Sequence, residues 1–184
     1  MMYFNKKKIE CHRAIEGLAA NTIKQLDLSY PIDVDYLLKK LGGKLCSINP
    51  KNHTVIIKRK NNFKISTCEQ DRHRLKEVIA KSIFHYLVHM HTDNVYVDAY
   101  DRGEGWSRTD NNWRWEDYCA EYYAMCLLMG KDQFYDAVDK LTKDGRFSLV
   151  DVAKEFDVSV SLAEKWVITT GIGVVGAPAA GVTK

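Results

Sequence analysis

The segment at residues 70–91 constrains the fold of this chain more than any other. Its apolar residues recur at steps of three and four, which predicts one long amphipathic helix near the middle of the sequence. These residues are Leu75, Val78, Ile79, Ile83, Tyr86 and Leu87. The same helix carries Lys81, Ser82, His85 and His89. Residues four apart lie on one helix face, so Lys81, His85 and His89 are expected to line one side.

The pattern on either side of this helix predicts a mixed α+β fold. Longer helices are expected at residues 6–26, 33–41, 115–129 and 131–142. A helical hairpin, two short helices joined at residues 157–159, is expected within residues 147–169. Short strands are expected at residues 44–48, 54–59 and 63–67, as a small antiparallel sheet. Residues 92–113 show no periodicity and are expected to form a long loop.

The composition fits one soluble domain. The chain has 184 residues, 46% hydrophobic and 28% charged, and we assign residues 1–170 to the domain and residues 171–184 to a Gly- and Ala-rich tail. The net charge of +3 is small, so nucleic acid is not an expected partner. Five scattered cysteines without a C-x-x-C pair, no signal peptide and no long apolar run predict a cytoplasmic protein with no membrane partner.

Residues 81–85, Lys-Ser-Ile-Phe-His, have the position of a zinc-protease motif but not its residues. In a His-Glu-x-x-His helix the two His bind zinc, and the Glu polarises the zinc-bound water. Here Lys81 replaces the first His and Ser82 replaces the Glu, while His85 is kept. The ammonium of a lysine, with an ordinary pKa of about 10.4, repels a dication. A serine hydroxyl is too weak a base to replace a carboxylate, so no catalytic residue is expected at these positions.

Four segments resemble, in the same order, the ImmA/IrrE family of metallopeptidase-like proteins. Residues 31–42 look like the family's opening "P-x-D-x…L…LG", and residues 74–89 match its "RxRFTLAHELGHLLLH" helix without a gap. Residues 116–129 are similar to the "E-x-x-A-N-x-F-A-x-x-LLMP" helix, which supplies the third zinc ligand. Residues 150–166 are similar to the closing "ELAxxFGVSxxALxxRL" segment. The resemblance implies a zincin-like helical domain with a small sheet and a C-terminal helical hairpin.

The departures from the family pattern fall at Lys81, Ser82, Phe84 and Glu121. The resemblance therefore implies a degenerate member that has lost proteolysis, is expected to need no cofactor, and acts by binding a protein partner. Members of the family often act against a repressor, so a phage or mobile-element regulator is the implied role. Lys81 is expected to occupy the place of the zinc and to pair with Glu116 or Asp117.

An active zinc metallo-endopeptidase with unusual ligands is the alternative. His85 would be one ligand, Glu116 or Asp117 the second, and His89 or Cys119 the third. Zinc is the cofactor only under this hypothesis. Simpler roles stay open for the same side chains: a buried His85 hydrogen-bonded to a neighbouring carboxylate, a His89 at the helix end, acids in a first helical turn and a buried Cys119 thiol.

Two further segments are candidates for contact with a partner. Trp106 and Trp113, in the predicted loop, are of a residue type that anchors interfaces, and with Lys81, His85 and Glu116 they would form a partner-binding cleft. Residues 147–169 look like a helix-turn-helix. Lys165 is the only cation on the would-be recognition helix, whereas a DNA reader has several polar or basic residues there. This segment is therefore expected to pack against the domain or a partner.

Overall fold

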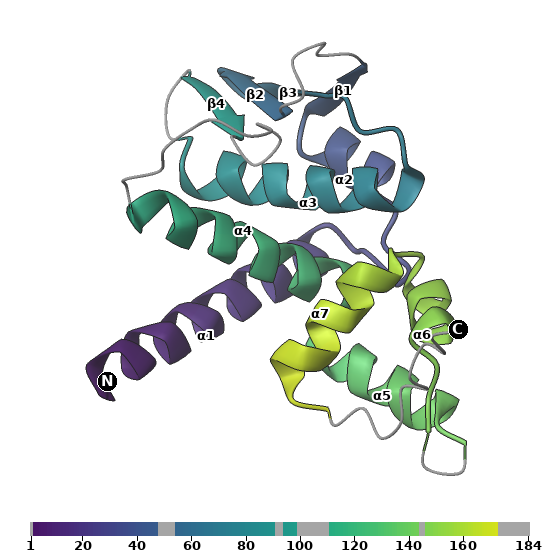
Figure 1. Cartoon of the computed structure of the whole chain (residues 1–184). Helices are drawn as coiled ribbons and strands as arrows, with labels where there is room; N and C mark the ends of the chain where they lie inside the picture. The colour runs from purple at the N-terminus through teal and green to yellow at the C-terminus, as the bar shows by residue number, and fades with distance from the viewer. Residues whose placement is uncertain (1, 48–53, 91–93, 99–110, 144–145, 173–184) are drawn as a thin grey trace, which may run out of the picture.

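The computed structural model describes residues 2–47, 54–90, 94–98, 111–143 and 146–172, and these form one sheet with helices on one of its faces (Figure 1). The helices are α1 (Met2–Gln25), α2 (Val34–Lys40), α3 (Arg72–Val88), α4 (Asn111–Met129), α5 (Lys131–Leu141), α6 (Leu149–Phe156) and α7 (Val160–Thr170). The strands are β1 (Gly43–Ser47), β2 (Thr54–Arg59), β3 (Asn62–Thr67) and β4 (Asn94–Asp98). The expected mixed α+β class is confirmed.

The sheet is mixed rather than antiparallel, with the strand order β1-β3-β2-β4. β2 pairs antiparallel with β3 and with β4, but β1 runs parallel to β3, from Gly43 opposite Phe63 to Ser47 opposite Thr67. The prediction of an antiparallel sheet is therefore wrong for β1. The tight turn at residues 60–61 returns β3 beside β2, and β3 then lies between β2 and β1. Strand patterns in the sequence do not say which neighbour a strand takes.

β4 and the first turn of α4 correct the prediction of a loop over residues 92–113. Residues 94–98 form an edge strand and α4 begins at Asn111, so residues 99–110 lie outside the described part. The pairing of β4 with β2 is a long-range contact, which no local sequence pattern indicates.

The helices are layered on one face of the sheet (Figure 1). α2 and α3 lie next to the sheet, α4 packs along α3 on the side away from the sheet, and α1 crosses α4 beyond it. The core continues through these layers, from Ile56 and Ile65 in the sheet to Ile83 in α3 and Leu127 in α4, all of them inaccessible to solvent. No described helix covers the opposite face of the sheet (Figure 1).

Polar side chains fix where several helices begin. The caps are Asp33 for α2, Asp71 for α3, Ser148 for α6 and Ser159 for α7. Each accepts a hydrogen bond from a backbone N–H in the first helical turn. The predicted helix start at Asp33 is confirmed, and so is the junction between the two closing helices at residues 157–159.

Asp157, between α6 and α7, joins the closing helices to the start of α3. Its carboxylate lies 2.8 Å from Arg72 Nη2, 3.2 Å from His73 Nε2 and 2.8 Å from Lys76 Nζ. Lys76 also donates to the backbone carbonyl of Asp157 at 2.9 Å. Burial raises the pKa of Asp157, but the hydrogen bond from Lys76 and the charges of Lys76 and Arg72 outweigh it and hold that pKa below its ordinary value.

Candidate functional site

The end of α3 and the start of α4 bring the predicted site residues onto neighbouring helices (Figure 1). Lys81, Ser82, His85 and His89 come from the second half of α3, and Glu116, Asp117 and Cys119 come from the first half of α4. The two helices run antiparallel, so these halves lie at the same end of the pair (Figure 1). The cleft that these side chains are expected to share stays a prediction.

Lys81 forms an ion pair on its own helix. Its Nζ lies 3.7 Å from Glu77 Oε1, four residues earlier, and both side chains are largely buried, with 14% and 15% exposed. Ser82, at the position of the general base, is 2% exposed. The predicted pairing of Lys81 with Glu116 or Asp117 stays a prediction. The i,i+4 partner could have been found from the sequence, because Glu77 and Lys81 share a helix face.

His85 and His89 are hydrogen-bonded to each other. Their Nδ1 atoms are 2.9 Å apart, so one must carry the proton and the other must accept it. Phe84 packs edge-on against both rings. Burial, followed by the charges of His89 and Lys81, lowers the pKa of His85 to about 3. His85 is therefore a neutral imidazole at physiological pH. Its expected burial is confirmed, and this hydrogen bond joins it to His89, whereas the expected carboxylate partner stays a prediction.

Cys119 of α4 contacts α1. Its Sγ lies 3.6 Å from Cys11 Sγ. Burial, the hydrogen bond with Cys11 and the charges of Cys11 and Glu116 raise the pKa of Cys119 to about 12. Metal binding requires the thiolate, which burial disfavours for as long as no metal ion is bound. Among the described residues, no group of three or more His, Cys, Asp or Glu side chains is placed to hold a metal ion.

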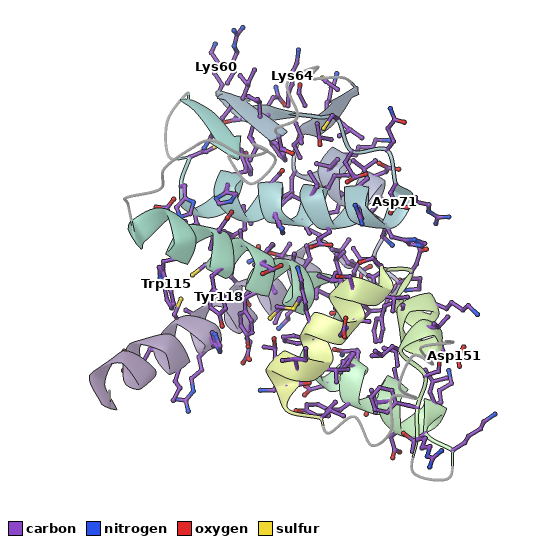
Figure 2. The ribbon with its side chains drawn as sticks, viewed as in Figure 1. Lys60, Lys64, Asp71, Trp115, Tyr118 and Asp151 are labelled. Atoms are coloured by element: carbon purple, nitrogen blue, oxygen red, sulfur yellow. The ribbon has the colours of Figure 1, made fainter. Side chains whose placement is uncertain are left out.

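The structure describes only part of the tryptophan residues that are expected to line the site. Trp106 lies outside the described residues, and for Trp113 the structure describes the backbone in α4 but not the side chain. Trp115 follows them in α4, is 37% exposed and stacks on Tyr118, with ring centroids 5.5 Å apart (Figure 2). An exposed aromatic ring is therefore held at the start of α4.

Glu121, which stands where the family pattern has Asn, accepts a hydrogen bond from Lys165 of α7. The neighbouring Trp166 is fully buried and packs edge-on against Tyr122 of α4, at 5.6 Å between centroids. The one cation of the would-be recognition helix is thus used in packing. The expectation that this segment packs against the domain is confirmed for these residues.

A row of stacked rings and hydrogen bonds joins α1 to α4, and it was not predicted from the sequence. The ring of His12 stacks on Tyr122 at 4.0 Å, and its Nε2 is 2.6 Å from the Tyr118 hydroxyl. The Tyr122 hydroxyl donates to Glu16 at 2.6 Å. His12 and Glu16 are four apart, as are Tyr118 and Tyr122, so matching polar stripes on two helices were the available signal.

No family model matches the chain, and no curated protein matches it. The resemblance to the ImmA/IrrE family therefore rests on the four sequence segments alone. Within the described ranges, no helix is long and apolar enough to cross a membrane.

Proposed function

We propose that this chain is a degenerate ImmA/IrrE-like protein with a zincin-like fold that binds a protein partner instead of cutting one. This proposal rests on the contacts made at the motif positions. Lys81 forms an ion pair with Glu77, and His85 forms a hydrogen bond with His89. A zinc peptidase needs these positions to hold a metal ion and its water. The residues present fit a zinc site poorly, since an ammonium and a buried hydroxyl replace a ligand and the base.

The start of α4 supports partner binding better than the motif positions do. His85 is 1% exposed and out of a partner's reach, whereas Trp115 presents an exposed ring held by Tyr118. Rigidly held aromatic side chains are common anchors of interfaces. Trp106 and Trp113 are close to Trp115 in the sequence and join the proposed binding surface. The resemblance favours a repressor or another regulatory protein as the partner.

The compartment and the biological role belong to the same proposal. All five cysteines are free thiols, which supports a reducing cytoplasm. Regulation in a phage or another mobile element is supported by the resemblance to the family.

The test is capture of the partner from the native host, followed by titration of the purified pair. Trp115→Ala is compared with Tyr135→Ala, which removes a similarly exposed ring (40%) on the distant helix α5. We expect the wild type and Tyr135→Ala to bind alike, and Trp115→Ala to bind at least about tenfold more weakly. A purified partner that binds all three proteins with one affinity would contradict the proposed surface.

A zinc endopeptidase is the second candidate, and one observation favours it. The Nδ1 atoms of His85 and His89 converge to 2.9 Å, not far from the spacing of about 3.3 Å that two nitrogens on a tetrahedral zinc ion have. Glu116 or Asp117 would have to complete the site. Stoichiometric zinc in protein purified without a His tag would favour this candidate.

A further inference from the structure

The charges of this chain are segregated along the sequence. Residues 39–68 contain eight Lys and Arg and no Asp or Glu. The whole chain carries only +3, so the remaining residues carry a net charge of −5. This segment includes the end of α2 and all of β1, β2 and β3. The small net charge, on which the expectation against nucleic acid rests, therefore conceals a strongly basic segment that forms most of the sheet.

The register of the sheet gathers three of these cations on its outer face. In β3 the buried side chains of Phe63 and Ile65 alternate with exposed Lys64, so Lys64 faces away from the helices. Lys44 of β1 is the direct partner of Lys64. Arg59 of β2, two residues beyond the partner of Lys64, shares this face. Figure 2 shows Lys60 and Lys64 projecting on the side of the sheet opposite α3.

The three cations gathered by the register lack carboxylate partners within the described part of the chain. They are Lys44, Arg59 and Lys64. No ion pair of 4.0 Å or less joins Lys44, Arg59 or Lys64 to a described acid, whereas Arg72 and Lys76 of α3 are both paired with Asp157. Like charges on directly paired strand positions, such as Lys44 and Lys64, repel each other and destabilise the sheet. A bound anion would relieve this repulsion.

The same face has a shallow hollow beside the cations. Its volume is about 170 Å³, and it is lined by Ile57, Arg59, Asn62, Phe63 and Lys64. The surface of the hollow is mostly apolar. Among its lining side chains, Arg59, Asn62 and Lys64 carry hydrogen-bond donors of the kinds that bind phosphate oxygens.

We propose that the outer face of β1, β2 and β3 binds the phosphate backbone of a nucleic acid duplex without reading its bases. The outward side chains of these strands include no aromatic ring, so single-stranded bases have no platform on which to stack. The outward Val55 and Ile57 are half-buried and do not protrude, unlike the apolar side chains that enter a bilayer. This surface is separate from the proposed partner-binding surface on α4.

Fluorescence anisotropy with labelled DNA and RNA duplexes of unrelated sequence, between 50 and 200 mM salt, tests the proposal. We expect similar affinities for all sequences, with log K falling against log salt at a slope of about −3, from about 0.9 for each of three phosphates. The variant Lys44→Gln/Arg59→Gln/Lys64→Gln should bind about 100-fold more weakly at 0.1 M salt, with a nearly flat slope. The single variant Lys64→Gln should weaken binding by about fivefold to tenfold.

The matched control is Lys24→Gln/Lys140→Gln/Lys154→Gln, which loses the same charge from exposed positions on α1, α5 and α6. It should bind like the wild type, and thermal unfolding should show that every variant is folded. Three results would overturn the proposal. They are an absence of salt-dependent duplex binding by the wild type, an equal loss in the control, or tighter binding of the same face to anionic phospholipid vesicles or to an acidic polypeptide than to duplex.

Discussion

Lys76 and Lys81 lie five positions apart on α3, yet they form different kinds of ion pair. Lys76 forms an ion pair with Asp157, which lies between α6 and α7. The same carboxylate also contacts Arg72 and His73. Lys81 pairs with Glu77 on its own helix, and the next turn holds the hydrogen bond between His85 and His89. The first half of α3 thus joins elements of the fold. In the second half, where a peptidase would hold its metal, this ion pair and this hydrogen bond both run along the helix itself.

The largest expected effect concerns pH and the second half of α3. Unfolded His85 has a pKa of about 6.5, and burial lowers the folded value to about 3. As the pH falls below 6.5 the unfolded chain takes up a proton that the folded chain refuses, so stability falls by up to about 1.4 kcal/mol per pH unit. Urea unfolding at pH 6 and pH 4 should differ by about 2–3 kcal/mol.

His85→Gln is the control for this pH dependence, because it removes the titrating group. Most of the loss between pH 6 and pH 4 should vanish in the variant. Asp157, whose pKa is lowered from 3.8, stabilises the fold above that pH and loses its contribution only as the pH falls below it. A variant that keeps the full slope between pH 6 and pH 4 would show that another group is responsible.

The next largest effect concerns the first half of α3. Asp157→Asn keeps a residue that tolerates the left-handed φ of 51° but leaves the largely buried Lys76 without a carboxylate. We expect the free energy of unfolding to fall by about 2 kcal/mol. Glu155→Gln, which breaks the exposed pair of Glu155 with Lys140, should cost about 0.5 kcal/mol or less. An equal fall in the free energy of unfolding of the two variants would contradict this account. The ion pairs of Asp157, which join separate elements, would then stabilise the fold no more than an exposed pair does.

The smallest effect tests the two lysines directly. Lys81→Met removes an i,i+4 ion pair and keeps the volume of the side chain, but it leaves the largely buried Glu77 without this partner, so it should cost about 1 kcal/mol. Lys76→Met, made in parallel, leaves Asp157 with Arg72 and His73 but without its closest buried partner, and should cost about 1.5 kcal/mol. Denaturant midpoints at constant slope give both values. If Lys81→Met proves the more damaging of the two, Lys81 has a structural role beyond its pair with Glu77.

Local patterns in the sequence predicted the elements that depend on local physics. The spacing of Leu75, Ile79 and Ile83 predicted α3, and the Asp33 cap predicted α2. The patterns missed the parallel pairing of β1 with β3 and the strand β4, because strand neighbours are chosen by long-range packing. The several contacts of Asp157 were also missed, since its three partners lie more than eighty residues earlier in the chain.

In the candidate site, too, some features follow from the local sequence and others depend on long-range packing. The replacement of a metal ligand and a base at Lys81 and Ser82 is visible in the sequence alone. The hydrogen bond between His85 and His89 follows from their spacing of four. The contact of Cys119 with Cys11 required the packing of α1 against α4, which no motif encodes.

The zinc content of two proteins, purified side by side without a His tag and dialysed, tests the central claim most directly. The back-substituted variant Lys81→His/Ser82→Glu restores the missing ligand and base of the family motif. The account predicts about one zinc ion per chain in this variant and no stoichiometric zinc in the wild type. One zinc ion per wild-type chain, retained through dialysis and accompanied by peptide hydrolysis, would contradict it, and so would a folded variant that gains no zinc.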